Sequence, residues 1–422
     1  MKNVPKLRFN GFSNEWEEKK LGDFLEFYST NSLSRECLNY ESGKIRNIHY
    51  GDIHMKFPTI LDAKKEIIPF INKDIDISKI KEDSYCKDGD LIIADASEDY
   101  NDIGKAIEIE NIDNDKVLAG LHTILARDTK GVTVKRFKGY LLLNDAVRKQ
   151  IKTLAAGAKV LGISKTNLVK VAVKLPSKEE QEKIANFLTK VDKLIEKQDE
   201  KVSNLELYKK GMMQKIFSQE IRFKKDDGGE YPEWIDTKLG KVGKFISGIA
   251  FNERYQGKLN LKYKIFKVSD MNLTGNETYM KNSNNTLSDE MISEMKANLI
   301  NKNSIIFAKV GAAIFLERKR IVNEEFLIDN NMMAFTPNNN IDIMFSFYIL
   351  QKTKLSKFAQ VGALPSYNAS DLANIKFKKP CLEEQFKIAN FLSKIDSIVE
   401  KEKEKLEEMR VWKKGLLQGM FV

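Results

Sequence analysis

Histidines and clustered carboxylates are the residues best suited to chemistry in this chain, and they are few. His49 and His54 lie close together in the stretch RNIHYGDIHM, with no acidic or cysteine constellation nearby. We interpret them as strand residues rather than metal ligands. His122 has no serine or cysteine motif around it. The acidic run DASEDYND (Asp95–Asp102) is interpreted as a solvated loop, with a carboxylate cluster as the alternative.

The cysteine and glycine patterns argue against several other kinds of site. Cys37, Cys86 and Cys381 lie far apart with no CxxC pair, which is typical of a reduced cytoplasmic protein and argues against structural zinc. The sequence has no GxxxxGK[ST] phosphate loop, no GxGxxG and no adjacent pair of prolines. The last absence excludes the [ND]PP[YF] motif of adenine amino-methyltransferases. We therefore predict a chain that catalyses nothing by itself, with no metal site.

The composition is that of a globular protein with two or three domains. The chain has 422 residues, of which 42% are apolar and 31% charged. No run approaches the ~20 apolar residues that a membrane-spanning helix needs. The start, MKNVPKLRFNGF, lacks the apolar region of a secretion signal. These features predict a cytoplasmic protein.

The net charge of +10 is concentrated in two long segments. Residues 1–175 carry 29 Lys and Arg against 26 Asp and Glu, for a net charge of +3. Residues 218–379 carry 24 against 18, for +6. The remaining segments are close to neutral. A modest basic excess of this kind is compatible with a polyanionic partner such as a nucleic acid.

Two stretches of the chain repeat one another: EEQEKIANFL (Glu179–Leu188) and EEQFKIANFL (Glu383–Leu392). Aligned without a gap, Pro176–Phe217 and Pro380–Phe421 match at 21 of 42 positions. Apolar residues recur at alternating spacings of four and three, which predicts a long helix in each copy, roughly 60 Å in length, with a coiled-coil seam. The predicted seam consists of Ile184, Leu188, Val191, Ile195, Gln198, Val202 and Leu205 in the first copy, and Ile388, Leu392, Ile395, Val399, Glu402, Leu406 and Met409 in the second.

One polar residue interrupts each predicted seam, Gln198 in the first copy and Glu402 in the second. Antiparallel packing would bring these side chains together at the centre, where they could hydrogen-bond and select the register at some cost in stability. A parallel pair would align them too. The other interpretation is that both side chains tilt into solvent at the edge of the seam. The repeat alone therefore leaves the direction of packing open.

The duplication extends beyond the helices. Short anchors recur at a constant offset: Trp16, Lys20-Leu21-Gly22, Ser29 and Asp52 return as Trp234, Lys238-Leu239-Gly240, Ser247 and Asp270. DGDLIIAD (Asp88–Asp95) corresponds to KNSIIFAK (Lys302–Lys309), and Leu161–Pro176 corresponds to Pro365–Pro380. Between these anchors the two halves differ almost completely. We interpret them as two modules that are built alike and recognise different things.

Local patterns within each module predict a mixed α/β fold. GDLIIAD and NSIIFAK are typical of short buried strands. Lys138–Ala155 and Ile343–Gln360 predict helices, each followed by a glycine-containing loop and a strand. The polar, Gly-rich segment Ile221–Trp234 is interpreted as a linker that leads into the second copy of the repeat. The predicted organisation is a globular domain over residues 1–175, a helix over 176–218, a second domain over 219–379 and a helix over 380–422.

This whole arrangement resembles the specificity subunit of type I DNA restriction–modification enzymes, and the resemblance covers essentially the whole chain. It implies that each globular domain is a target recognition domain for one half of a bipartite DNA site, and that the two long helices pack as an antiparallel coiled coil. One loop departs from the internal match, because GISK (Gly162–Lys165) becomes SYNA (Ser366–Ala369). The residues that carry the resemblance are Trp16 with Lys20–Gly22, Asp88–Ile93, Ile163–Leu168 and Glu179–Leu188, with their counterparts in the second half.

The resemblance also implies partners. Double-stranded DNA would be the ligand, and the helices would hold the domains apart and dock two modification subunits, which bind S-adenosylmethionine. Motor-nuclease restriction subunits would join for cleavage, with ATP and Mg²⁺ also held by partner subunits rather than by this chain. A structural coiled-coil scaffold without nucleic acid is the main alternative. It explains the helices but not two dissimilar basic domains on a common frame.

Contacts to DNA are expected from polar and basic residues on predicted loops at matching places in the two domains, although each could instead be a solvated surface residue. Side chains that reach base edges would specify sequence, and Lys and Arg on phosphates would supply position and affinity. The candidates are Ser29, Thr30, Asn31, Arg35, Lys159, Lys165 and Thr166 in the first domain, and Ser247, Arg254, Tyr255, Lys309, Arg318, Lys319, Arg320 and Tyr367 in the second.

Overall fold

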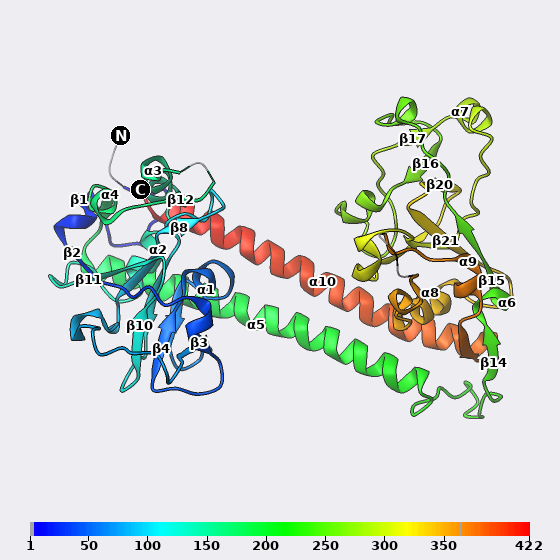
Figure 1. Ribbon diagram of the computed structural model, residues 1–422, viewed down its shortest axis with the longest axis horizontal. Helices are drawn as coiled ribbons and strands as arrows, with labels where there is room; N and C mark the ends of the chain where they lie inside the picture. Colours follow the sequence, from blue (N-terminus) through cyan, green and yellow to red (C-terminus); the bar gives the residue numbers. More distant parts are fainter. Residues whose placement is uncertain (1–3, 158, 361, 363) are drawn as a thin grey trace. The chain divides into compact units, whose positions relative to one another are not determined.

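The chain forms two compact units in the computed structural model, which describes residues 4–157, 159–360, 362 and 364–422. Unit 1 comprises Met1–Glu200 with Lys403–Val422, and unit 2 comprises Lys201–Glu402. Each unit thus contains a globular part and about half of each long helix, α5 (Lys178–Phe217) and α10 (Leu382–Met420). The predicted mixed α/β fold with two long helices is confirmed (Figure 1).

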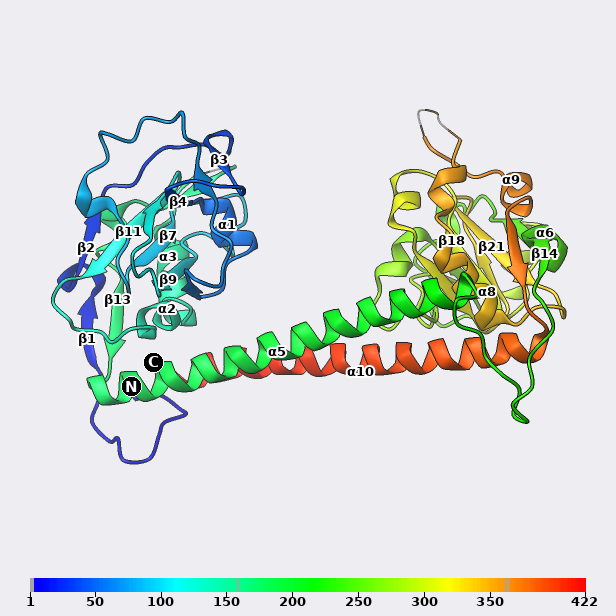
Figure 2. The same ribbon diagram turned by 90° about the horizontal axis from the view of Figure 1, so that it is seen from below.

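Unit 1 is built on a five-stranded sheet in the order β2-β11-β7-β9-β5. Figure 2 labels β2, β11, β7 and β9 of this sheet. Its first four strands pair antiparallel, and β5 pairs parallel with β9. A second sheet has the order β10-β4-β6-β3. The bounds are β2 (Leu25–Tyr28), β3 (Leu38–Asn39), β4 (Ile45–Ile48), β5 (Ile60–Asp62), β6 (Phe70–Ile71), β7 (Leu91–Ala94), β9 (Ala106–Glu110), β10 (Lys116–Ala119) and β11 (Thr123–Asp128).

Unit 2 has a four-stranded antiparallel sheet in the order β15-β21-β18-β19. Counted along the chain, this is the same order and pairing as β2-β11-β7-β9 in unit 1. A smaller sheet has the order β17-β16-β20. The predicted buried strands in GDLIIAD and NSIIFAK are β7 and β18. The bounds are β15 (Gly243–Ser247), β16 (Tyr263–Phe266), β17 (Thr286–Leu287), β18 (Ser304–Ala308), β19 (Lys319–Val322), β20 (Phe326–Ile328) and β21 (Met332–Pro337).

A two-stranded ribbon leads into each long helix, and it explains the repeated Lys-Leu-Gly anchors. In unit 1, β1 (Glu17–Lys20) pairs antiparallel with β13 (Ala172–Leu175), and in unit 2, β14 (Ile235–Lys238) pairs with β22 (Lys376–Lys379). Two positions after the first strand of each ribbon, a glycine lies close to a neighbouring segment of the chain. A Cβ on Gly22 would lie 2.8 Å from the Cβ of Val169, and one on Gly240 would lie 2.9 Å from that of Ala373. Only glycine fits without displacing the neighbouring chain.

Several short helices and strands complete the units. They are α1 (Tyr50–Met55), β8 (Ala96–Ser97), α2 (Phe137–Leu141), α3 (Asp145–Leu154), β12 (Leu161–Gly162) and α4 (Lys165–Leu168) in unit 1, and α6 (Leu239–Val242), α7 (Asp289–Glu294), α8 (Ile343–Lys352) and α9 (Ala369–Ala373) in unit 2. Among the described residues, none of the helices combines the length and apolar character that crossing a bilayer requires.

The helices expected over Lys138–Ala155 and Ile343–Gln360 are each interrupted. The first divides into α2 and α3 because the Asn144 side chain caps α3, accepting hydrogen bonds from the N–H of Ala146 at 2.8 Å and of Val147 at 3.2 Å. The second stops at Lys352 and resumes as a 3₁₀ helix, Leu355–Phe358. There the Glu317 carboxylate accepts from the N–H of Leu355 and of Ser356.

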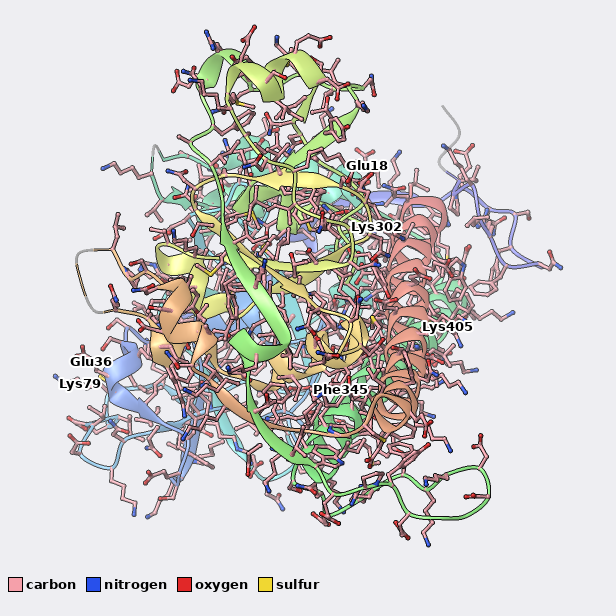
Figure 3. All side chains as sticks on the ribbon, turned by 90° about the vertical axis from the view of Figure 1, so that its right-hand side faces the viewer. Glu18, Glu36, Lys79, Lys302, Phe345 and Lys405 are labelled. Carbon is pink, nitrogen blue, oxygen red and sulfur yellow. The ribbon has the colours of Figure 1, made fainter. Side chains whose placement is uncertain are left out.

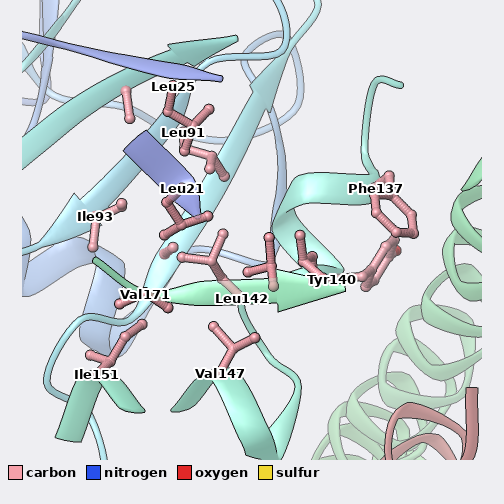
Figure 4. Close-up of a cluster of buried hydrophobic side chains, with 14 of the residues drawn as sticks. Leu21, Leu25, Leu91, Ile93, Phe137, Tyr140, Leu142, Val147, Ile151 and Val171 are labelled. Carbon is pink, nitrogen blue, oxygen red and sulfur yellow. The ribbon is translucent and has the colours of Figure 1, made fainter. Parts of the chain in front are cut away.

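A large apolar core in each unit joins the sheet to a long helix. In unit 1 the cluster in Figure 4, with Leu91, Ile93 and Phe137, is continuous with Ile184 and Leu188 of α5. In unit 2 the fully buried Phe345, labelled in Figure 3, packs its ring against Phe217 and Trp234. Its cluster continues into Ile388, Leu392, Ile395 and Val399 of α10. Burial of these faces fixes each helix to its own globular part.

The repeated Glu-Glu-Gln sequence anchors α5 in unit 1 through buried polar contacts. The second glutamate, Glu180, is buried and receives two hydrogen bonds from the Arg8 guanidinium, both 2.8 Å long. Gln181 is also buried. It accepts from the Val134 N–H at 3.0 Å and donates to the Pro176 carbonyl at 3.0 Å. These contacts compensate the burial of polar groups at the start of the helix.

The same arrangement recurs at the start of α10 in unit 2. Glu384 is fully buried and binds the Arg222 guanidinium at 3.3 and 3.0 Å. It also accepts a hydrogen bond from the indole N–H of Trp234 at 2.9 Å. Gln385 accepts from the Asp342 N–H at 2.9 Å and donates to the Pro380 carbonyl at 2.8 Å. Both repeated motifs therefore attach a long helix to the domain before it.

Charged side chains connect segments of α5 and α10 within each unit. In unit 1, Asp192 pairs with Lys413 at 2.5 Å, and Asp199 pairs with Arg410 at 3.0 Å. In unit 2, Lys201 pairs with Glu402 at 2.6 Å, and Lys209 pairs with Asp396. In both units the partner's number on α10 falls as the number on α5 rises.

A buried tyrosine completes each of two equivalent ion pairs. Tyr140 donates to Asp192 at 2.8 Å in unit 1, and Tyr348 donates to Asp396 at 2.7 Å in unit 2. Burial, reinforced by the neighbouring carboxylate, raises the pKa of both phenols. The repeated Lys-Lys-Gly sequence supplies the cations of these pairs, because Lys209 and Lys413 are its first residues.

Most residues of the predicted seam are buried, and the others are half-buried. Gln198 is only 7% exposed, so tilting into solvent is wrong for this side chain. The Glu402 side chain is 19% exposed and forms the ion pair with Lys201. The polar interruptions therefore lie within the packed part of their own units.

Candidate nucleic-acid interface

The predicted contact residues after β2 divide into one exposed side chain and two half-buried ones. Ser29 is exposed. The Thr30 hydroxyl donates to the carbonyl of Thr123 at 3.0 Å. Asn31 donates to the side chain of Asn47 at 2.7 Å and to the Ala119 carbonyl at 3.1 Å. Thr30 and Asn31 thus fix this segment onto the sheets and leave Ser29 facing solvent.

Arg35 lies on the 3₁₀ helix Arg35–Cys37 rather than on a loop, and it neutralises a buried carboxylate. Its guanidinium donates to Asp52 at 2.8 Å, and Asp52 is 1% exposed. The hydrogen bond to Asp52 raises the pKa of Arg35. The counterpart of Asp52, Asp270, is fully buried and accepts from the N–H of Lys267 at 2.8 Å. The repeated aspartates are therefore structural.

Lys159, Lys165 and Thr166 are all exposed in unit 1. Lys165 and Thr166 belong to the short helix α4 rather than to a loop. The Lys165 ammonium donates to the carbonyl of Tyr28 at 2.8 Å, at the end of β2. The fold therefore brings Lys165 next to Ser29, although 136 positions separate them in the sequence.

In unit 2 the fold brings Ser247, Lys309 and Tyr367 together. The Lys309 ammonium donates to the Ser247 hydroxyl at 3.1 Å, and the N–H of Tyr367 donates to the Lys309 carbonyl at 3.0 Å. Tyr367 is only 4% exposed, and its ring packs against Phe307. Burial raises the pKa of this tyrosine. The expected surface position is therefore wrong for Tyr367, which belongs to the core.

Arg254 and Tyr255 lie on a 3₁₀ helix (Glu253–Tyr255) and share a partner on α7. Tyr255 is 5% exposed and donates to Glu294 at 2.5 Å. Arg254 lies 3.6 Å from the same carboxylate, with 63% of its side chain exposed. Tyr255 is thus a packed residue rather than a loop residue, while Arg254 faces solvent.

Lys319 and Arg320 belong to β19, so the expected loop position is wrong for both. Lys319 is 3% exposed and pairs with Glu317, and burial lowers its pKa. The Arg320 guanidinium donates to the Asn276 carbonyl at 2.5 Å. Arg318, just before the strand, contacts the side chain of Asn272. Lys319 is thus buried with a charged partner, which compensates its burial, whereas Arg318 and Arg320 are half-buried.

The residue that follows β7 in unit 1, and the residue that follows β18 in unit 2, each join two other segments through backbone hydrogen bonds of the same pattern. In unit 1 the N–H of Asp95 donates to the His122 carbonyl at 3.1 Å, and the N–H of Ile163 donates to the Asp95 carbonyl at 2.8 Å. In unit 2 Lys309 occupies the place of Asp95: its backbone N–H donates to the Asn331 carbonyl at 2.7 Å, and its carbonyl accepts from the N–H of Tyr367. We call this place the strand-end junction.

Asp95, His122 and Asn331 at the strand-end junctions were missed as candidate contacts. The alignment of DGDLIIAD with KNSIIFAK already placed Asp95 opposite Lys309, which was the available signal. The interpretation of Asp95–Asp102 as one solvated loop is also corrected, because Ala96 and Ser97 form the buried strand β8.

All three histidines gather around Tyr50. His49 caps α1 by accepting from the Gly51 N–H at 3.1 Å, and His54 lies within α1, so neither is a strand residue. The ring of Tyr50 lies 4.6 Å from that of His49, 5.9 Å from that of His54 and 5.3 Å from that of His122. Over the residues that the structure describes, no three His, Cys, Asp or Glu side chains are arranged to hold a metal ion.

Comparisons with known proteins agree with a chain built of two similar halves. The family model for the type I restriction modification DNA specificity domain matches residues 13–206 and 231–409. The putative type I restriction enzyme MjaX specificity subunit of Methanocaldococcus jannaschii is 27% identical over 432 residues, covering 97% of this chain and 94% of the relative. The MjaVIII specificity subunit of the same organism is 28% identical over 277 residues, covering 62% of this chain and 64% of the relative.

Solved structures show the same fold. The type I restriction–modification system S subunit from M. genitalium covers 99% of both chains with a TM-score of 0.57 at 16% identity. A chain from a structure describing complex assembly and conformational transition of the type I R-M system covers 95% of this chain and 96% of its own, with a TM-score of 0.57 at 14% identity. At such identities the likeness is one of fold alone.

Proposed function

Since the chain belongs to the family of type I restriction–modification DNA specificity domains, we propose that it is the non-catalytic specificity subunit of such an enzyme. Each globular part would recognise one half of a bipartite DNA target. The observation that carries this proposal is the shared sheet order in the two units, with different side chains at the equivalent strand-end junction. A common frame that presents different side chains suits two domains that read different sequences.

The two long helices are proposed to pack as an antiparallel coiled coil that sets the distance between the half-sites. The opposite numbering of ion-pair partners within each unit supports this direction. The equivalent Tyr–Asp–Lys groups support a duplicated, pseudo-twofold arrangement. Half-sites about one helical turn apart, roughly 34 Å, lie on one face of the duplex, so a rigid spacer is a natural device.

The helices are also proposed to dock two modification subunits, which would bind S-adenosylmethionine, and restriction subunits would join with ATP and Mg²⁺. Apolar side chains that remain exposed on the helices support docking. They are Leu194, Val411 and Trp412 in unit 1, and Leu207, Tyr208 and Ile398 in unit 2. Methylation of a base requires its extraction from the duplex, which the partner subunit would perform.

Binding of the purified chain to duplex DNA should fall steeply with salt, because cations on phosphates release counterions. We expect at least about a tenfold loss of affinity between 50 and 200 mM salt, measured by fluorescence anisotropy. Lys165→Ala should reduce the salt slope by about one, the effect of losing one phosphate contact. Lys405→Ala, at an exposed position on α10 labelled in Figure 3, is the matched control and should not change the slope. Absence of DNA binding would favour the scaffold alternative.

Exchange of residues 1–175 for the equivalent domain of a relative should change one half of the methylated target and leave the other half unchanged. The physical reason is that unit 1 and unit 2 have separate cores. The measurement is an adenine-methylation map of a methylation-free host that expresses the chain with its modification subunit, compared with that subunit alone. A change in both half-sites would refute independent recognition.

A further inference from the structure

The strand-end junctions carry opposite chemistry at equivalent positions. In unit 1 the two side chains at the junction are a carboxylate and an imidazole, those of Asp95 and His122. In unit 2 they are an ammonium and an amide, those of Lys309 and Asn331. Backbone hydrogen bonds of the same pattern hold both pairs at the ends of β7 and β11 or of β18 and β21. A shared backbone with opposite side-chain charge is the arrangement expected where the frame is fixed and the ligand differs.

In unit 1 the His122 imidazole has two neighbours, Asp95 and Tyr50. Its Nδ1 lies 3.4 Å from the Asp95 carboxylate, and its ring packs edge-to-face on Tyr50 at 5.3 Å. Its backbone is left-handed, with φ of 53°, and about half of its side chain is exposed. Nδ1 is the nitrogen that faces Asp95, and a neutral imidazole that carries its proton there presents Nε2 as a hydrogen-bond acceptor. Across the described residues, no protein group donates to Nε2.

The charge of Asp95 restricts what the junction of unit 1 faces in bound DNA. A carboxylate repels phosphate, so it suits a base edge with an amino group, the N6 of adenine or the N4 of cytosine. The Lys165 ammonium lies nearby, at the end of β2, and can neutralise a flanking phosphate. Because the frame is equivalent, the same position in unit 2 is occupied by Lys309.

Lys309 and Asn331 provide donors at the junction of unit 2. The Lys309 ammonium has three donors, and its hydrogen bond to Ser247 orients it at the end of β15. Asn331 is exposed and donates to Asp329 at 3.2 Å, which fixes its side chain. Lysine donors match the O6 and N7 acceptors of guanine in the major groove.

We propose that the strand-end junction is a base-reading position in each domain. Through Nε2 of His122 and the carboxylate of Asp95, unit 1 accepts the amino group of adenine or cytosine, and unit 2 donates from Lys309 to guanine. This inference rests on the proposed function and goes further, because it assigns one position of each half-site to named residues and to a class of base.

The test transfers the unit 2 pair into unit 1 of the full chain, assembled with its modification subunit. The variant Asp95→Lys/His122→Asn places the unit 2 pair in unit 1. We measure methylation of duplex libraries in which each position of one half-site is randomised in turn. One position of the first half-site should shift from adenine or cytosine towards guanine, by roughly 5- to 150-fold in relative preference, while the second half-site is unchanged.

Milder variants keep the test interpretable. Asp95→Asn preserves shape and should weaken discrimination at that same position. Glu98→Gln removes the same charge from an exposed residue three positions along and should leave the motif unchanged. The reciprocal variant Lys309→Asp should alter one position of the second half-site only.

The outcomes separate this inference from the proposed function. If the Asp95 and Lys309 variants lower methylation of all sequences equally and leave the motif unchanged, the junctions are structural and the inference is overturned. If the unmodified chain directs no sequence-specific methylation, the proposed function is wrong, and the inference that rests on it is wrong too. A base change confined to one position of the expected half-site supports the inference.

Discussion

Replacing Arg222 with alanine should destabilise unit 2 by about 3 kcal/mol, because it leaves a carboxylate buried without its charge partner. Glu384 is fully buried, and the Arg222 guanidinium binds both of its oxygens. Loss of one member of such a pair costs about 3–5 kcal/mol. The lower end applies because the indole N–H of Trp234 still donates to Glu384.

The measurement is hydrogen exchange of the first turns of α10, which reports local opening of unit 2. Arg222→Lys should recover part of the protection, and Arg222→Ala/Glu384→Gln should recover more, because the uncompensated charge is gone. Arg410→Ala is the matched control. Its ion pairs with Asp199 and Glu407 are about half exposed or more, so its loss should cost less than about 1 kcal/mol. Equal effects of the Arg222 and Arg410 variants would contradict the argument.

The periodic parts of the structure could be predicted from the sequence. Alternating spacings of four and three predicted α5 and α10, and short apolar runs predicted β7 and β18. These signals are local and come from burial of one face or of a whole strand. The repeated Glu-Glu-Gln was visible too. Its role was not, because the partners of Glu180 and Glu384 lie more than 150 residues away in the sequence, at Arg8 and Arg222.

The candidate site was harder to predict because charge and polarity alone do not determine exposure. Lys319 was expected at the surface, but the nearby Glu317 compensates its burial in β19. Tyr255 and Tyr367 also pack inward, the first with its hydroxyl on Glu294 and the second with its ring against Phe307. The contact between His122 and Asp95 depends on sheet pairing, which no local pattern specifies.

Lengthening both long helices should abolish methylation of the original target. The variant inserts seven residues after Glu200 in α5 and seven after Glu402 in α10. Seven residues preserve the spacing of four and three and add about 10 Å to each helix, with a rotation within about 20° of whole turns. On the proposed antiparallel spacer, the two domains would move apart with little relative rotation.

A longer DNA spacer cannot restore both the distance between the half-sites and their relative orientation around the duplex. A target longer by about three base pairs restores the distance, but it turns the second half-site by roughly 100° around the duplex, since one turn takes 10–10.5 base pairs. The two domains would then face different sides of the DNA. We therefore expect loss of the original methylation motif, and any residual methylation should occur at a longer gap between unchanged half-sites.

The control for this variant is an insertion of the same seven residues in the exposed turn at Asp227–Gly229, which lengthens the chain without lengthening a helix. Methylation maps of the two variants, made in the same host with the same modification subunit, separate spacer length from chain length. The turn insertion should keep the original motif at its original gap. Full methylation of that motif by the two-helix variant would mean that the helices do not set the distance. The half-sites would then have to be positioned by the domains or by the modification subunits.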